Sequence, residues 1–187
     1  MRFEASSPAL VRQWVRERTI ATDVGLIIAF SLLIGLLAHL VIPLPFTPVP
    51  VTGQTFGVLL TGAVLGSRLG TATLLAYIVE GTVGLPVFAA GTHGPATYGY
   101  LAGFVAAAFI VGWLVEHGWD RDAPRLVAAM VAGEVAIYVF GLLWLARFVP
   151  VSQVLALGLF PFLLGDAVKL AAAALAAGGG RRLARQG

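Results

Sequence analysis

Apolar runs of near-spanning length follow one another along almost the whole chain, and this repetition limits the possible folds more than any other feature. A transmembrane helix needs about 20 mostly apolar residues. Hydrophobic residues make up 59% of the 187 residues and charged residues only 11%, a composition typical of membrane proteins. No stretch between the runs is long enough for a separate soluble domain. We therefore expect an all-α integral membrane protein with a single membrane domain.

Proline, glycine and charged residues divide the apolar pattern into six expected transmembrane helices. Their ranges are residues 24–42, 54–66, 71–83, 98–115, 126–145 and 154–177. The second and third are short for a span, so a cavity or neighbouring helices must cover their ends. The first run is longer than the apolar core of a signal peptide, and we expect it to be retained.

The chain accordingly divides into three parts. We expect an N-terminal segment with a short amphipathic helix lying at the membrane interface over residues 1–23, the six-helix membrane domain over residues 24–178, and a basic tail over residues 179–187. An even number of spans places both termini on the same side of the membrane.

The arginines indicate which side that is. On the side of the termini the expected topology places Arg2, Arg12, Arg16, Arg18, Arg68, Arg121, Arg125, Arg181, Arg182 and Arg185. Only Arg147 falls on the other side. The positive-inside rule therefore predicts that both termini are cytoplasmic, with the proline-rich loop after residue 42 and the glycine-rich loop after residue 83 facing outward.

Lys169, the only lysine of the chain, lies inside the last apolar run, three residues after Asp166. Residues three apart share a helix face, and an ionised side chain at the centre of a bilayer costs about 2.5–3.5 kcal/mol on insertion scales. The two residues form either a structural ion pair or a polar clamp for a substrate. We favour the clamp, because opposite charges at one point in a membrane need a reason beyond packing.

Two further carboxyl groups lie within apolar runs. Glu80 ends the third run just below the glycine-rich loop, where a ligand role and a structural role are about equally plausible. For Glu134, a protonated carboxyl bonded to a neighbouring helix is at least as plausible as a contact with a ligand. One lysine cannot neutralise three carboxyls, so we expect at least one of them to be protonated in the empty protein.

Three uncharged residues complete the candidate substrate-binding set. Gln54 directly follows the proline-rich loop, where a role as a helix cap is the alternative. Tyr77 and Tyr100 are the other two, although tyrosines in membrane helices are more often core or interface aromatics than binding-site residues. The candidate set is therefore Asp166, Lys169, Glu80, Gln54, Tyr77 and Tyr100.

Several kinds of chemistry are excluded or disfavoured. The chain has no cysteine, no Gly-Lys-Ser/Thr phosphate loop, no Gly-x-Ser-x-Gly elbow and no His-Glu-x-x-His pair. We expect no metal and no cofactor. We also expect no nucleic acid as a partner, since the basic residues lie at the ends of apolar runs, where membrane topology accounts for them. An intramembrane enzyme that uses Glu80 and Asp166 remains an alternative, although it lacks a nucleophile and metal ligands.

Five segments occur in an order and spacing that match those of a known protein family. They are residues 42–50 (IPLPFTPVP) followed by Thr52, Gln54 and Thr55, residues 62–70, residues 84–88 (GLPVF), residues 98–104 (YGYLAGF) and residues 165–169 (GDAVK). A weaker match covers Ile137 and Tyr138 with Gly141 and Trp144. Together they resemble the BioY family, the substrate-capture components, or S components, of energy-coupling-factor biotin transporters.

The resemblance implies a six-helix protein of the prokaryotic plasma membrane. Such a protein captures biotin from outside and delivers it through a transmembrane coupling subunit and two ATPase subunits. The resemblance further implies that Asp166 and Lys169 contact biotin. Gly25 and Ala29 stand at the spacing of the family's Ala-x-x-x-Ala, which contacts the coupling subunit.

The chain departs from the family's pattern before the fourth helix. The family's Gly-Pro-Thr-Gly-Gly-Tyr reads Pro-Ala-Thr-Tyr-Gly-Tyr here, at residues 95–100. Two alternatives within transport stay open: an S component for another small vitamin, and a solitary biotin transporter driven by protons through the buried carboxyls.

Overall fold

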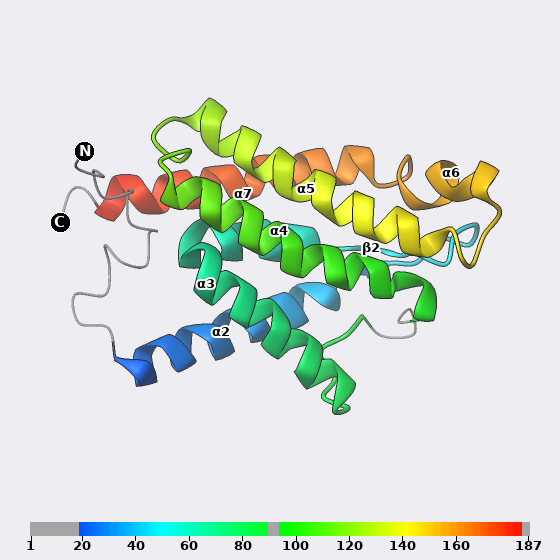
Figure 1. Cartoon of the computed structure of the whole chain (residues 1–187), viewed down its shortest axis with the longest axis horizontal. Helices are drawn as coiled ribbons and strands as arrows, with labels where there is room; N and C mark the ends of the chain where they lie inside the picture. The colour runs from blue at the N-terminus through cyan, green and yellow to red at the C-terminus, as the bar shows by residue number, and fades with distance from the viewer. Residues whose placement is uncertain (1–18, 90–93, 185–187) are drawn as a thin grey trace, which may run out of the picture.

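The computed structural model describes residues 19–89 and 94–184 and shows a bundle of long helices with a small β-ribbon at one end (Figure 1). The helices are α2 (Ile20–Ala38), α3 (Gln54–Thr82), α4 (Tyr98–Glu116), α5 (Ala123–Leu145), α6 (Val154–Gly158) and α7 (Leu163–Ala184). Strands β1 (Val41–Ile42) and β2 (Val51–Thr52) pair antiparallel across the proline-rich loop. Short 3-10 turns, η1 (Pro95–Thr97) and η2 (Val151–Gln153), precede α4 and α6.

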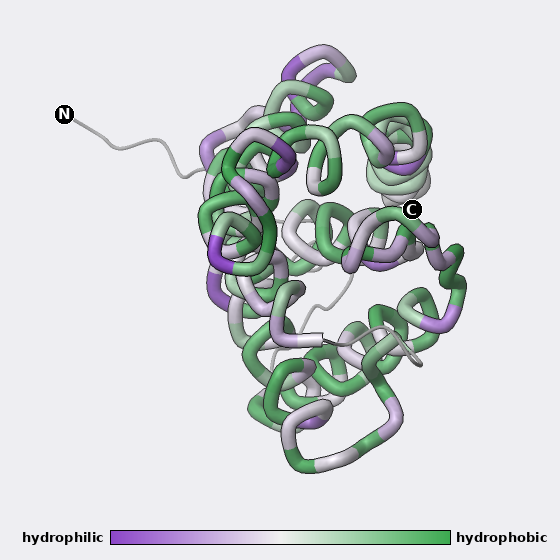
Figure 2. The backbone as a smooth tube through the Cα atoms, turned by 90° about the vertical axis from the view of Figure 1, so that its right-hand side faces the viewer, coloured by the Kyte–Doolittle hydropathy of each residue, from purple (hydrophilic) through white to green (hydrophobic). Residues whose placement is uncertain are grey.

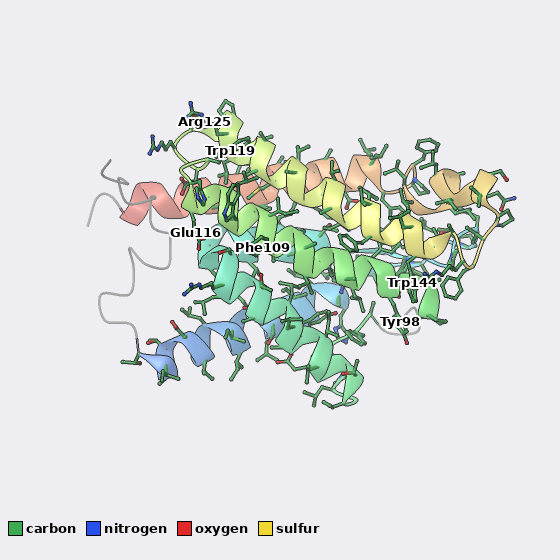
Figure 3. All side chains as sticks on the ribbon, viewed as in Figure 1. Tyr98, Phe109, Glu116, Trp119, Arg125 and Trp144 are labelled. Carbon is green, nitrogen blue, oxygen red and sulfur yellow. The ribbon has the colours of Figure 1, made fainter. Side chains whose placement is uncertain are left out.

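Within the described residues, five helices are long and apolar enough to cross a membrane, namely α2, α3, α4 together with η1, α5 and α7. Successive long helices run in alternating directions, and α2 begins at the same end of the molecule at which α7 finishes (Figure 1). The side chains of Glu116, Trp119 and Arg125 mark that end, which we call the Arg125 end (Figure 3). Tyr98 and Trp144 lie at the opposite end, which we call the ribbon end because β1 and β2 are there (Figures 1 and 3).

Helix α3 is bent back on itself at Gly66. This glycine has φ 81° and ψ −178°, a backbone conformation that is essentially restricted to glycine. A straight helix would separate Gln54 from Tyr77 by about 35 Å. Instead the Gln54 Nε2 donates a hydrogen bond of 2.8 Å to the Tyr77 hydroxyl. The two halves of α3 therefore correspond to the expected second and third helices, which the sequence placed at residues 54–66 and 71–83.

The bend is held by the end of α4. The Glu116 carboxylate accepts one hydrogen bond from the Ser67 backbone N–H (3.0 Å) and another from the Ser67 hydroxyl (2.7 Å). The first N–H groups of a helix have no partner within it, so Glu116 satisfies one of those at the start of the second half of α3. A Cβ atom on Gly112 would lie 2.3 Å from the Ser67 nitrogen, which is why α4 can approach the bend this closely.

The last apolar run contains a break, and the expected continuous helix over residues 154–177 was wrong in this respect. Helix α6 ends at Gly158 and α7 begins at Leu163. Pro161 lies between them, and proline has no N–H for an intrahelical bond and disfavours helical conformation in the residue before it. At its other end α7 continues to Ala184, so no break in the helix marks the expected boundary at residue 178.

The N-terminal expectation is only partly covered by the structure. Most of the amphipathic segment expected over residues 1–23 falls on residues 1–18, which lie outside the described ranges. Helix α2 already begins at Ile20, after an N-cap at Thr19 whose hydroxyl accepts from the Thr22 N–H. The first span thus starts four residues before the expected position at residue 24.

Two clusters of buried side chains fill the bundle. The cluster near the ribbon end includes Tyr77, Tyr100, Phe104, Ile137 and Phe162. The cluster nearer the Arg125 end includes Leu59, Val111, Val115, Met130 and Ala173. Hydrophobic residues predominate along the helices (Figure 2). Many large hydrophobic side chains are exposed, such as Leu36 on α2, Leu143 on α5 and Leu164 on α7, as expected for helices whose outer faces contact lipid.

Candidate functional site

A cavity lies in the half of the bundle toward the ribbon end. It holds about 690 Å³ of space free of protein atoms, part of which is open to the surroundings of the protein. Pockets for small ligands combine apolar walls with a few polar anchors, as this cavity does. The lining residues are Val49, Pro50, Thr52, Gln54, Thr55, Phe88, Ala89, Thr97, Tyr100, Leu101, Phe104, Ile137, Tyr138, Phe162, Asp166 and Lys169.

The charged wall of the cavity is the beginning of α7. The Lys169 Nζ lies 2.7 Å from the Asp166 Oδ1, and the two side chains are only 19% and 7% exposed. Because the break around Pro161 starts α7 anew at Leu163, Asp166 falls in the first turn of a helix. A negative charge is stabilised there by the helix dipole. The break that the sequence prediction missed therefore places this ion pair at a helix start beside the cavity.

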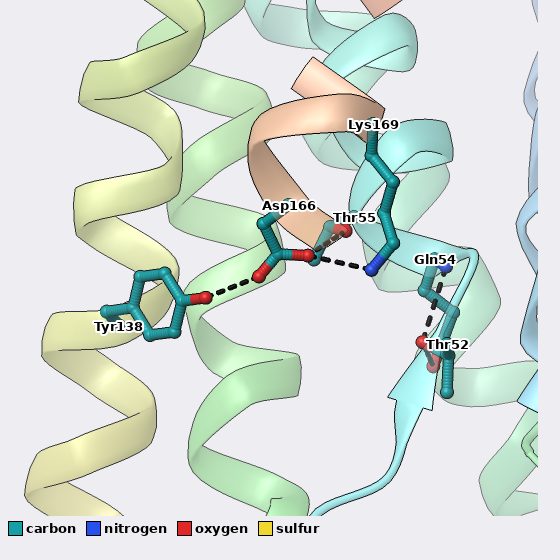
Figure 4. Close-up of polar contacts among 6 residues, drawn as sticks. All are labelled: Thr52, Gln54, Thr55, Tyr138, Asp166 and Lys169. Atoms are coloured by element: carbon teal, nitrogen blue, oxygen red, sulfur yellow. Dashed lines mark hydrogen bonds and ion pairs between the residues drawn. The ribbon is translucent and has the colours of Figure 1, made fainter. Parts of the chain in front are cut away.

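Asp166 receives two more hydrogen bonds, from α3 and from α5 (Figure 4). The Thr55 hydroxyl donates to Oδ1 at 3.1 Å, and the Tyr138 hydroxyl donates to Oδ2. An ionised carboxylate has about four acceptor positions, and three are occupied. Lys169 carries three N–H donors, and within the described part of the chain it donates only to Asp166. Most of the free hydrogen-bonding capacity of the pair therefore belongs to Lys169.

Gln54 is held rigidly at the edge of the cavity. Its Oε1 accepts from the Thr52 hydroxyl at 2.9 Å, and its Nε2 donates to the Tyr77 hydroxyl at 2.8 Å. Tyr77 in turn donates to the Val87 carbonyl at 3.0 Å. This chain of bonds connects β2, both halves of α3 and the loop that follows α3. Tyr77 is fully buried behind Gln54 and is absent from the cavity lining.

Tyr100 lines the cavity with its ring while its hydroxyl is bound elsewhere. The hydroxyl donates to the Gly158 carbonyl at 2.9 Å and so ties α4 to the end of α6. A Cβ atom on Gly141 would lie 2.4 Å from the Tyr100 ring, so α5 needs a glycine to make room for it. Tyr100 therefore offers the cavity an aromatic wall.

Glu80 lies outside the lining of the cavity. Its Oε1 accepts a hydrogen bond of 2.8 Å from the Ser31 hydroxyl, which joins α2 to α3. Of the six predicted residues, the structure brings four to the cavity: Asp166, Lys169, Gln54 and Tyr100. In residues 19–89 and 94–184 no group of three or more His, Asp and Glu side chains is arranged to hold a metal ion.

Sequence reasoning did not include Thr55 and Tyr138 in the site. Both donate to Asp166, and both line the cavity. A signal for each was present: Thr55 directly follows Gln54, and Tyr138 is a polar aromatic one helical turn after Glu134 in an apolar run.

Apolar helices of spanning length around a partly open cavity with a charged anchor define a helical membrane protein with a pocket for a small molecule. The family model described as BioY family matches residues 8–186, and the chain belongs to this family.

Relatives with assigned names cover most of the chain. A protein of Pyrococcus horikoshii named "Probable biotin transporter BioY" is 38% identical over 84% of this chain and 94% of that protein. A protein of Rhizobium etli named "Biotin transporter BioY" is 36% identical over 81% of this chain and 87% of that protein. These names are those of transporters, which agrees with the expectation that the chain is not an enzyme.

A solved structure shares the fold. The chain is similar to a crystal structure described as the S-component for biotin from an ECF-type ABC transporter, with a TM-score of 0.77 and 24% sequence identity. The similarity covers 91% of this chain and 96% of that chain. The helical fold class expected from the sequence is therefore confirmed.

Proposed function

We propose that this protein captures biotin within the membrane and takes part in its uptake. The observation that carries the proposal is the Lys169–Asp166 pair in the wall of a partly open cavity, in a chain of the BioY family whose relatives are named biotin transporters. The protein binds and releases its ligand and makes no covalent bond with it.

The chemistry of biotin matches the cavity. Biotin has a ureido ring with two N–H donors and one carbonyl, an apolar thiophane ring, and a tail that ends in a carboxylate. The free N–H groups of Lys169 suit either the ureido carbonyl or the carboxylate, and the remaining acceptor position of Asp166 suits a ureido N–H. The aromatic and aliphatic walls, including Phe88, Phe104 and Phe162, suit the thiophane ring and the tail.

The proposed ligand-binding set follows from this fit. Asp166 and Lys169 contact biotin, Gln54 and Tyr100 form walls next to it, and Thr55 and Tyr138 hold the Asp166 carboxylate in place. Tyr77 acts through Gln54, and Glu80 stabilises the contact between α2 and α3.

We further propose that the chain crosses the prokaryotic plasma membrane six times, with each half of α3 counted as one crossing. Both termini are then cytoplasmic, as the arginine distribution supports: Arg68 and Arg125 lie toward one side, and Arg147 lies toward the other beside Trp144. The cavity is nearer the ribbon end, so biotin enters from outside. In this arrangement residues 24–178 form the membrane domain between the N-terminal segment (residues 1–23) and the basic tail (residues 179–187).

Delivery into the cell requires partners in this proposal: a transmembrane coupling subunit and two ATPase subunits. Membership of the BioY family supports it, and so does the absence of a phosphate-binding loop from the sequence. Gly25 and Ala29 are both exposed on α2 and are the proposed contact with the coupling subunit.

Biotin binding by purified Lys169→Ala tests the proposal. We expect the wild-type protein to bind biotin and to be stabilised by it against heat, while a panel of other vitamins has no such effect. Loss of the ammonium should weaken biotin binding by about tenfold to a hundredfold, since a hydrogen bond to a charged group contributes about 1.5–3 kcal/mol. Arg68→Ala is the control, because Arg68 is exposed at the bend of α3, far along the helix from Gln54.

Two results would contradict the proposal in different ways. Stabilisation by another vitamin and not by biotin would assign a different ligand to the same pocket. Wild-type affinity in Lys169→Ala would leave the ligand in place and refute the role of the ion pair.

A further inference from the structure

Glu134 on α5 is a buried acidic residue that the proposed binding site does not use. Its side chain is only 8% exposed, and neither carboxyl oxygen accepts a hydrogen bond from a donor among the described residues. The Asp166 carboxyl is within hydrogen-bonding reach of it, and two carboxyls share a hydrogen bond only when one of them carries a proton. It lies four residues before Tyr138, so both side chains occupy the same face of α5. Since Tyr138 reaches Asp166, this face of α5 is turned toward the start of α7.

The surroundings of Glu134 are apolar apart from the ion pair and two tyrosine hydroxyls. Asp166 and Lys169 on α7 are the charged groups that act on it electrostatically. Tyr138 lies on its own helix, with Tyr100 of α4 near Tyr138. Leu59 of α3 and Val111 of α4 pack against the neighbouring Gly133.

An ionised carboxylate is expensive in such a place. Burial in an apolar region disfavours the charged form, and the nearby negative charge of Asp166 disfavours it further. In the described part of the chain, Lys169 is the only cation that acts on Glu134, and it is already paired with Asp166 at 2.7 Å. Ionised Glu134 would therefore have to compete for the ammonium group.

We propose that Glu134 is a positioning residue for ligand binding: it carries a proton in the ligand-binding form and thereby leaves the free N–H groups of Lys169 to the ligand. The inference rests on the proposed function, because the ligand whose oxygen uses those N–H groups is biotin. With Glu134 neutral, Asp166 and Lys169 cancel, and the pocket accepts an oxygen that carries a partial or full negative charge. With Glu134 ionised, the group formed by Asp166, Lys169 and Glu134 has a net negative charge, and a second carboxylate attracts the ammonium group.

The proposal predicts a specific dependence of affinity on pH. As the pH rises and Glu134 loses its proton, biotin affinity falls, because the ligand and Glu134 then need the same ammonium group. We expect a fall of about tenfold, equivalent to about 1.4 kcal/mol. Glu134→Gln keeps the shape of the side chain and remains neutral at every pH, so its affinity should lack this fall.

The experiment measures biotin affinity of the full chain in lipid nanodiscs from mildly acidic to mildly alkaline pH. Wild type, Glu134→Gln and a second neutral variant, Glu134→Leu, are compared. Glu80→Gln is the matched control, since Glu80 is also a membrane carboxyl with one unpartnered oxygen, but its other oxygen is bonded to Ser31 of α2. It should retain the wild-type pH profile. Infrared difference spectroscopy between wild type and Glu134→Gln detects the C=O band of a protonated carboxyl directly.

A fall in wild type and in Glu80→Gln that is absent from the folded Glu134 variants supports the proposal. A fall of equal size in all four proteins overturns it. If wild-type affinity does not change, the infrared band decides: its presence up to alkaline pH supports a proton on Glu134, and its absence overturns it. If wild type binds no biotin at any pH, the proposed ligand is wrong, while the infrared measurement still tests the proton on Glu134.

Discussion

At the scale of single residues, Asp166 and Lys169 are unequal partners in their ion pair. Asp166 accepts from three side chains, on α3, α5 and α7, whereas Lys169 is bound to Asp166 alone among the described residues. Removing Asp166 leaves a partly buried ammonium and two hydroxyls without their acceptor. Removing Lys169 leaves a carboxylate that still accepts from Thr55 and Tyr138.

This inequality predicts that Asp166→Ala destabilises the protein more than Lys169→Ala does. Removing one partner of a buried ion pair costs about 3–5 kcal/mol, and the two remaining hydrogen bonds of Asp166 should reduce the cost of losing Lys169 by about 1–3 kcal/mol. The measurement is the thermal unfolding midpoint of each variant in detergent without biotin. Equal midpoints would show that Thr55 and Tyr138 do not stabilise the carboxylate.

The pairing of Asp166 with Lys169 could be predicted from the sequence because it is local, being set by the three-residue spacing along one helix. The contacts of Glu80 could not be predicted. Its partner Ser31 is 49 residues away, and only the packing of α2 against α3 brings the two together. The same holds for Tyr138, which is 28 residues from Asp166.

At the scale of elements, the bend in α3 decides where the cavity can be. It returns Tyr77 to Gln54, and their hydrogen bond fixes the edge of the cavity at β2. Glycines in residues 62–70 indicated a turn between two short helices, so the bend was predictable. The break at Pro161 was less apparent, because proline there is flanked by apolar residues whose pattern continues through it.

Gly66→Ala should destabilise the protein by about 1–3 kcal/mol, the cost of holding a residue with a side chain in this backbone conformation. The control is Gly178→Ala in α7, where a Cβ atom would have no atom within 4 Å and should be neutral or slightly stabilising. Thermal unfolding of both variants in detergent checks the prediction. If the two glycines respond alike, the conformation at Gly66 is not what holds the bend.

At the scale of the whole molecule, α2 is the least embedded of the long helices. In the apolar 18-residue stretch of α2 that could cross the membrane, only 17% is buried within the protein, compared with 61% for the corresponding stretch of α3. A Cβ atom added to Gly25 would have no atom within 4 Å, so a side chain there would point away from the rest of the described chain. A small residue at such a place fits the close helix contact with the coupling subunit proposed above.

Gly25→Leu combined with Ala29→Leu therefore separates binding from delivery. We expect the double variant to bind biotin within about twofold of wild type, while copurification with the coexpressed coupling and ATPase subunits falls by about tenfold, as for a lost interface contact worth about 1.4 kcal/mol. Leu143→Trp on α5 is the control, because Leu143 is 72% exposed and a bulky residue there should disturb neither property.

Uptake of biotin by cells completes this test. In the proposed mechanism the double variant loses uptake together with copurification, and cells that lack the coupling subunit show none even with the wild-type chain. Uptake that persists in those cells and collapses with the proton gradient would instead support a solitary transporter. The contacts at Gly25 and Ala29 would then have no role in delivery, and the buried carboxyls Glu80 and Glu134 would become the candidates for carrying protons.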